Sequence, residues 1–171
     1  MLFRSIQRLE AYAKNPRHSE FILKNLWEEA QKNDRKTLLS VASALAKFDP
    51  EGPLWQEISV PVADRLITEG EKNATQYFIW TGLLSNASEQ LRKPLLEIAL
   101  KLTGNVQDEL RFQGELRGDL AADLLNRVAA DHFETLHKLV MEGRPEQFAA
   151  VFKNYETKHR STAVGELREE L

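Results

Sequence analysis

The chain of 171 residues contains no cysteine. This absence excludes disulfide bonds, thiolate nucleophiles, and zinc or iron–sulfur sites built on cysteine ligands. Glycine and proline are scarce, with 8 and 6 residues, well below their average combined share of about 12%. A chain with so few turn-forming residues is not expected to form a hairpin-rich β-sandwich or β-barrel.

Long apolar runs and a concentrated charge of one sign are missing too. The longest uncharged stretch, 73–88, is 16 residues long and partly polar, so it is too short and too polar to span a bilayer. The first residues lack the apolar region of a secretory signal, and we expect a cytoplasmic protein. The net charge is −3. Without a basic surface, nucleic-acid binding is not expected.

What the sequence does contain is helical periodicity. Apolar residues recur at spacings of three and four, and no segment alternates with period two. This pattern predicts an all-α protein of about ten short helices, which lie around residues 2–14, 17–32, 35–48, 54–66, 73–84, 88–102, 108–130, 131–142, 148–155 and 161–171. Because short links favour antiparallel neighbours, we expect one domain over residues 1–171, an α-solenoid of HEAT or armadillo type made of stacked helix hairpins.

Four local expectations follow from the turn-forming and capping residues. Pro61 predicts a kink, or a 3₁₀ turn at Leu54–Ser59 followed by a helix from Val60. Gly114 and Gly118 weaken the first half of the helix at 108–130, and a break there is one alternative. Capping-box patterns at 73–76 and 131–134 predict the starts of two helices. Ser161 is expected to cap a separate last helix.

The segment 73–84 is apolar on every side. Tyr77, Trp80 and Leu84 share one helical face, whereas Ile79 and Phe78 fall on others. A helix of this kind is expected to be buried on more than one side. The sequence therefore predicts helices packed on both flanks of this segment.

Histidines and carboxylates offer no clear catalytic or metal-binding set. His132 and His137 are five residues apart, about 140° around a helix, and do not share a face, while His18 and His159 are distant. A helical zinc pair needs a spacing of three or four. Another candidate is the stripe of acids at residues 115, 119 and 123, which could hold a divalent cation or perform acid–base work. The interleaved arginines 111, 117 and 127 favour a solvated, ion-paired face instead.

The three tryptophans have two interpretations. Trp27, Trp55 and Trp80 resemble the aromatic side chains that helical-repeat DNA glycosylases use in a basic groove, but each lies in an apolar pattern and no basic groove is indicated. Core packing is therefore favoured. The sequence also lacks a glycine-rich phosphate loop and a nucleophile elbow. We predict no enzyme activity, and no catalytic, cofactor-binding or metal-binding residues.

Three stretches of the chain together resemble a known family. They comprise residues 41–50 with 54–55 and 62–66, then residues 92–96, then residues 121–125 with 129–131 and 145–152. Their order is similar to that of the helical-repeat spacer of large bacterial proteins, best known from planctomycetes, in which an N-terminal Ser/Thr kinase domain is joined to a C-terminal formylglycine-generating-enzyme-like domain. The resemblance covers residues 35–171, although Arg111–Gly118 departs from the pattern.

The resemblance implies a non-catalytic spacer, because neither a kinase signature nor a formylglycine-generating segment is present in the chain. Our leading hypothesis is a scaffold that binds a protein partner or neighbouring domains of a larger chain. The alternative is a HEAT-like domain for nucleic-acid binding or repair, which would need a basic concave face. A third hypothesis is a small-molecule-binding helical regulator with an apolar cavity near Trp80.

Overall fold

All regular structure in the described part of the chain is helical. The computed structural model describes residues 16–32, 37–101 and 108–169. Within these ranges there is no strand, and eight α-helices and one 3₁₀ helix follow one another. They are α2 (Pro16–Gln31), α3 (Leu38–Phe48), α4 (Trp55–Lys72), α5 (Ala74–Leu83), η1 (Ser85–Ala87), α6 (Ser88–Leu100), α7 (Asp108–Val128), α8 (Phe133–Glu142) and α9 (Pro145–Glu169). The predicted all-α class is confirmed, while the helix expected at 2–14 lies outside the described residues.

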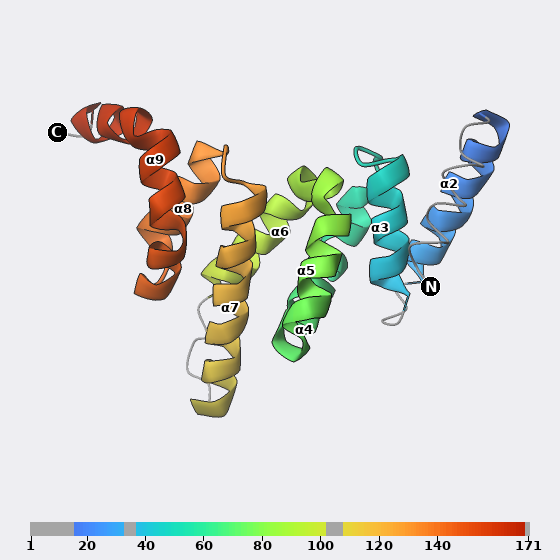
Figure 1. Cartoon of the computed structure of the whole chain (residues 1–171), viewed down its shortest axis with the longest axis horizontal. Helices are drawn as coiled ribbons and strands as arrows, with labels where there is room; N and C mark the ends of the chain where they lie inside the picture. Colours follow the sequence, from blue (N-terminus) through green and yellow to red (C-terminus); the bar gives the residue numbers. More distant parts are fainter. Residues whose placement is uncertain (1–15, 33–36, 102–107, 170–171) are drawn as a thin grey trace.

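Helices that follow each other in the sequence pack as pairs. α2 contacts α3, α4 contacts α5, α6 contacts α7, and α8 contacts α9. The first helices of successive pairs touch, and α3 contacts α5 as α7 contacts α9. Figure 1 shows the pairs following one another along the long axis of the molecule, from α2 at one end to α9 at the other. We call α2, α4, α6 and α8 the first row, and α3, α5, α7 and α9 the second row.

One apolar core runs through these pairs, from Trp27 in α2 to Tyr155 in α9. Trp55 is fully buried, and its indole Nε1 donates a hydrogen bond to the Asp49 carbonyl at 2.9 Å. The Trp27 indole donates to the Asp49 carboxylate at 3.2 Å and meets the Trp55 ring edge-on, with ring centres 6.1 Å apart. Two of the three tryptophans are thus core residues, as predicted, and they hold the loop that enters α4.

The start of α4 differs from the expectation. No separate 3₁₀ turn precedes Val60, because α4 is one helix from Trp55 to Lys72 with Pro61 inside it. Proline removes one backbone hydrogen bond and costs about 3 kcal/mol in a helix interior. Burial of Trp55 and Ile58 in the first turn contributes about 1.5–3 kcal/mol for each side chain. The packing of the first turn therefore outweighs the proline.

Helix α7 is continuous from Asp108 to Val128, so the break considered at Gly114 and Gly118 does not occur. Gly118 is buried where α7 meets other elements: a Cβ at this position would lie 2.9 Å from Gln147 Nε2 and 3.2 Å from the Ala99 carbonyl oxygen. Glycine at 118 is thus required by close packing, and it does not end the helix.

Two predictions for the C-terminal part are wrong. Asp131 does not cap α8, since His132 is the N-cap residue and the Asp131 carboxylate accepts a hydrogen bond from Lys158 Nζ at 2.7 Å. Ser161 begins no separate helix, because α9 continues from Pro145 to Glu169. The start of α9 carries a cap that the sequence analysis missed, in which Gln147 Oε1 accepts from the Arg144 backbone N–H at 2.9 Å.

Candidate interaction surface

The expectation that α5 is buried on more than one side is wrong. Tyr77 is its buried side chain, at 3% exposure, whereas Phe78 is 52% and Ile79 is 44% exposed. In two rows of helices a helix covers the core with one side, and its other side faces solvent. The apolar residues of α5 therefore form a surface, and this surface is the candidate functional site.

Two contacts hold α5 in place. At its start, Asn73 Oδ1 accepts a hydrogen bond from the Gln76 backbone N–H at 3.1 Å, as the capping pattern predicted. On its inner side, the Tyr77 hydroxyl donates to the Leu120 carbonyl of α7 at 3.1 Å. Burial, with a smaller effect of the Asp123 charge, raises the pKa of Tyr77 above its usual value. The hydroxyl thus remains a donor at neutral pH and holds α5 against α7.

The outward side of α5 is uncharged. Thr75, Phe78, Ile79 and Gly82 follow a spacing of three and four, so they share one side of the helix, and all four are exposed. No atom lies within 4 Å of the position that a Cβ on Gly82 would take. The helix backbone is therefore accessible there. We call these four residues the α5 face.

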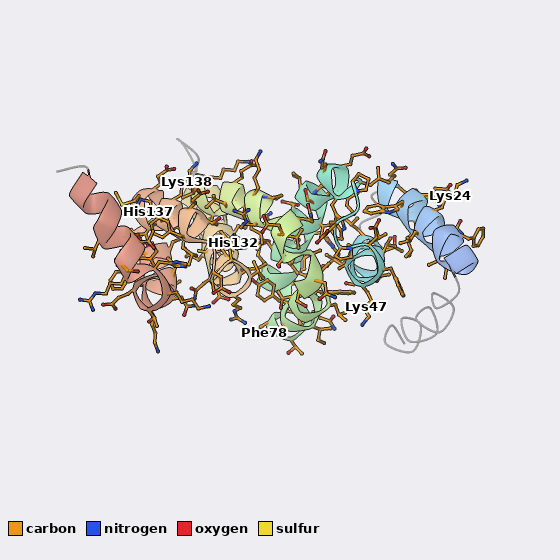
Figure 2. The ribbon with its side chains drawn as sticks, turned by 90° about the horizontal axis from the view of Figure 1, so that it is seen from above. Lys24, Lys47, Phe78, His132, His137 and Lys138 are labelled. Atoms are coloured by element: carbon orange, nitrogen blue, oxygen red, sulfur yellow. The ribbon has the colours of Figure 1, made fainter. Side chains whose placement is uncertain are left out.

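Three elements next to α5 carry basic side chains. The Arg127 guanidinium of α7 lies over the Phe78 ring, 4.8 Å from its centre, and also pairs with Asp123 at 2.9 Å. Lys47 is exposed in the last turn of α3, which contacts α5, and Figure 2 shows Lys47 and Phe78 on the same side of the molecule, opposite Lys138. Lys72 is exposed at the end of α4, directly before the cap of α5. We call Lys47, Lys72 and Arg127 the basic rim.

The acids of the α7 stripe are ion-paired, but only Asp123 pairs with one of the interleaved arginines, Arg127. The Asp119 carboxylate lies 2.5 Å from Arg144 Nη2, and Glu115 lies 3.9 Å from Arg144 Nη1. Burial raises the pKa of Asp119, and the Arg144 charge offsets this in part. Glu115 and Asp119 of the stripe thus form a structural contact between α7 and the start of α9.

Arginines also connect α7 and α6 to other helices. Arg117 pairs with Asp64 at 2.5 Å and with Glu71 at 3.0 Å, both on α4. Arg92 of α6 pairs with Glu89 and donates to the Thr135 hydroxyl of α8 at 2.8 Å. The side chain of Arg111 lies outside the described residues. Each of these contacts joins elements of the chain itself.

Each of the three described histidine side chains has its own hydrogen-bond or ion-pair partner. His132 Nε2 lies 3.2 Å from Glu89, His137 Nδ1 lies 2.7 Å from the Tyr155 hydroxyl, and His159 Nε2 lies 2.9 Å from the Ala130 carbonyl. His137, Tyr155 and His159 pack around the Phe133 ring between α8 and α9. His18 is in α2, but its side chain is not described. Within the described residues, no group of three histidines and acids could hold a metal ion.

Two findings concern the chain as a whole and not the α5 face. Among the described helices, none is long and apolar enough to cross a membrane. Comparison of the chain with protein-family models, with curated proteins and with solved structures finds no match.

Sequence reasoning missed Phe78, Ile79 and Gly82 as surface residues. Their apolar character was interpreted as burial on several sides. Two features of the sequence could have indicated an exposed side of α5. The links on both sides of this helix are short, and residues 73–88 carry no charge. A ten-residue helix in a row of paired helices must leave one side open unless another layer covers it.

Proposed function

We propose that the chain is a non-catalytic α-helical repeat scaffold that binds a protein partner through the α5 face. The observation that carries this proposal is the exposure of Phe78 and Ile79 on a helix whose outward side has no charged residue. Contiguous exposed apolar patches mark protein interaction sites, whereas single exposed apolar residues are common on any protein surface.

The packing of the helix pairs supports a repeat architecture of HEAT-like type. Each described pair packs against the next along the first row, so contacts are made mostly between neighbours in the sequence. Arrays of this kind offer extended surfaces made by one row of helices. Helix α5, which carries the α5 face, lies in the middle of the second row (Figure 1).

The alternative of nucleic-acid binding has less support. A protein that binds phosphates needs arginines and lysines that can reach the backbone of the nucleic acid. Arg65, Arg92, Arg117, Arg127 and Arg144 all pair with carboxylates of the chain. Salt-dependent binding of duplex DNA would favour this alternative over the scaffold.

Site-specific photo-crosslinking tests the proposed function. A photoreactive phenylalanine analogue would replace Ile79 in one version of the chain and Phe21 of α2, which is also exposed, in a control version. In cells of the source, we expect a discrete crosslinked protein from position 79 and not from position 21. That protein, purified, should bind the chain and lose affinity for a Phe78→Ser variant. Absence of any adduct, or the same adducts from both positions, would contradict the proposal.

Small-angle scattering tests the array itself. A compact chain of this length has a radius of gyration of about 15.5 Å. We expect a larger value, since the pairs follow one another along one axis (Figure 1). A value equal to that of a compact chain would contradict the repeat architecture.

A further inference from the structure

We infer that the α5 face binds an amphipathic helix of the partner, whose apolar side packs on Phe78, Ile79 and Gly82 and whose flanking residues are acidic. This inference rests on the proposed function, because it names the chemistry of the partner at the same surface. Two features of the molecule support it, the shape of the α5 face and the charges of the basic rim.

The shape of the α5 face suits a helix. Phe78 and Ile79 project on one side of α5, with Gly82 one turn further along, where no side chain covers the backbone. Two helices approach closely when a small residue on one accepts a larger side chain of the other. Partner helices that bind in this way present apolar residues at spacings of three, four and seven.

The basic rim determines the charge of the partner. Lys47 lies on the α3 side, Lys72 lies before the start of α5, and Arg127 covers one side of the Phe78 ring. Because α5 itself has no charged residue, the charges next to a docked helix come from its neighbours, which are the exposed Lys47 and Lys72 and the ion pair between Arg127 and Asp123. Complementary charges at the edge of an interface select the correct partner and steer its approach.

The same charges argue against a second copy of the chain as the occupant. A symmetric dimer brings the same patch of both copies together. Two α5 faces would then place one basic rim against the other, and like charges in contact are unfavourable. An acidic helix meets no such repulsion.

Peptide titrations test the inference directly. Each peptide has about 18 residues, which make five helical turns. The acidic peptide has a Leu/Ala stripe flanked by Glu, the basic peptide has the same stripe flanked by Lys, and the scrambled peptide has the acidic composition without a stripe. Vesicles of phosphatidylcholine and phosphatidylglycerol are a fourth probe. Binding is followed by fluorescence anisotropy of labelled peptides and by sedimentation with vesicles.

We expect the acidic peptide to bind at least about tenfold more tightly than the basic and scrambled peptides, and the vesicles not to bind. Phe78→Ser should weaken the acidic peptide about 30-fold, as for an aromatic residue at the centre of an interface. Lys47→Glu should weaken it about fivefold, as for a charge at the rim. The matched controls Phe21→Ser and Lys138→Glu, on α2 and α8, should leave binding unchanged.

Four results would overturn the inference: equal or tighter binding of the basic peptide, equal binding of the scrambled peptide, unchanged binding by Phe78→Ser, or vesicle binding that depends on Phe78. Circular dichroism during thermal unfolding verifies that Phe78→Ser is folded, and Ile79→Ser replaces it if it is not. The failure of this inference can be distinguished from the failure of the proposed function. If a crosslinked protein binds the chain through Phe78 while the acidic peptide does not, the scaffold stands and the acidic helix is wrong.

Discussion

Helices α5 and α7 both belong to the second row, yet their outward surfaces differ in kind. The charged side chains of α7 between residues 114 and 128 are all ion-paired, and they pair within α7 or with α4 and with Arg144 before α9. Helix α5 has no charged residue and exposes Phe78 and Ile79. The chain itself supplies ion-pair partners for the surface of α7, whereas Phe78 on the α5 face meets only the Tyr77 ring and the Arg127 guanidinium among the ring contacts of the described residues and stays half-exposed.

We therefore expect α7 to matter for the stability of the fold and the outward side of α5 to matter for binding. The contacts of α7 hold successive helix pairs together, so changes there should lower the free energy of unfolding. The outward side of α5 contributes little burial, so changes there should affect binding and leave the fold intact. Substitutions on the two kinds of surface should therefore change the free energy of unfolding by different amounts.

The largest effect is expected from the buried side of α7. Leu125→Ala removes a fully buried side chain and should lower the free energy of unfolding by about 2–5 kcal/mol, because it leaves a cavity. Urea denaturation followed by circular dichroism measures this change. The control is Leu116→Ala on the same helix, where the side chain is 42% exposed and the loss should be below about 0.5 kcal/mol. Equal losses at both positions would show that α7 is not packed as described.

Alanine substitutions at two glycines, Gly82 and Gly118, should change the free energy of unfolding by intermediate amounts and in opposite directions. Alanine normally stabilises a helix interior relative to glycine, by about 0.5–1 kcal/mol. Gly82→Ala should show this gain, since nothing lies near its Cβ position. Gly118→Ala should instead destabilise by about 1–3 kcal/mol through overpacking, because the new Cβ would meet Gln147 Nε2, which is buried and donates to the Ala99 carbonyl at 2.8 Å. Thermal unfolding of both variants measures the sign, and a gain at Gly118 would contradict the contact.

The smallest effect is expected from the titration of surface ion pairs, which the α5 face lacks. The Arg92 guanidinium hydrogen-bonded to Glu89 lowers the pKa of that carboxyl below its ordinary value of 4.5. Since the folded-state pKa is lowered, the contribution of Glu89 to stability is present above 4.5 and is lost as the pH falls through the lowered pKa. Glu89 is half-exposed, and the contribution should be about 0.5 kcal/mol.

Glu89→Gln should therefore lower stability at neutral pH and reduce the loss of stability on acidification. The measurement is the free energy of unfolding between neutral pH and pH 3, where the curves of wild type and variant should converge. Glu97→Gln, on the exposed side of the same helix, is the control and should follow the wild type throughout. Parallel curves for Glu89→Gln and wild type would contradict the lowered pKa.

Much of the fold could be predicted from the sequence, because it follows from local patterns. Spacings of three and four placed most helices, and the cap at Asn73 was found from its distance to Gln76. The 3₁₀ turn considered at Leu54–Ser59 and the break considered at Gly114 and Gly118 do not occur, for one reason. Propensity describes an isolated helix, whereas the buried Trp55 and the contacts of Gln147 act through tertiary packing.

The candidate site could not be predicted in this way. Periodicity shows which residues of α5 are apolar, but whether a second layer covers them depends on the arrangement of the whole array. Phe78 and Ile79 were therefore assigned to the core on the same evidence that correctly assigned Tyr77. A local rule that fails at a surface is itself informative, since such failures are expected where a chain is adapted to bind.

The most direct measurement is a map of backbone amide chemical shifts during titration of the acidic peptide into the chain. Binding through the α5 face predicts shift changes confined to residues 74–83 and to the neighbourhood of Lys47, Lys72 and Arg127, with α8 and α9 unaffected. The same titration with Phe78→Ser should show no such changes. Shift changes centred on α8 and α9, or none in α5 of the wild type, would contradict the account.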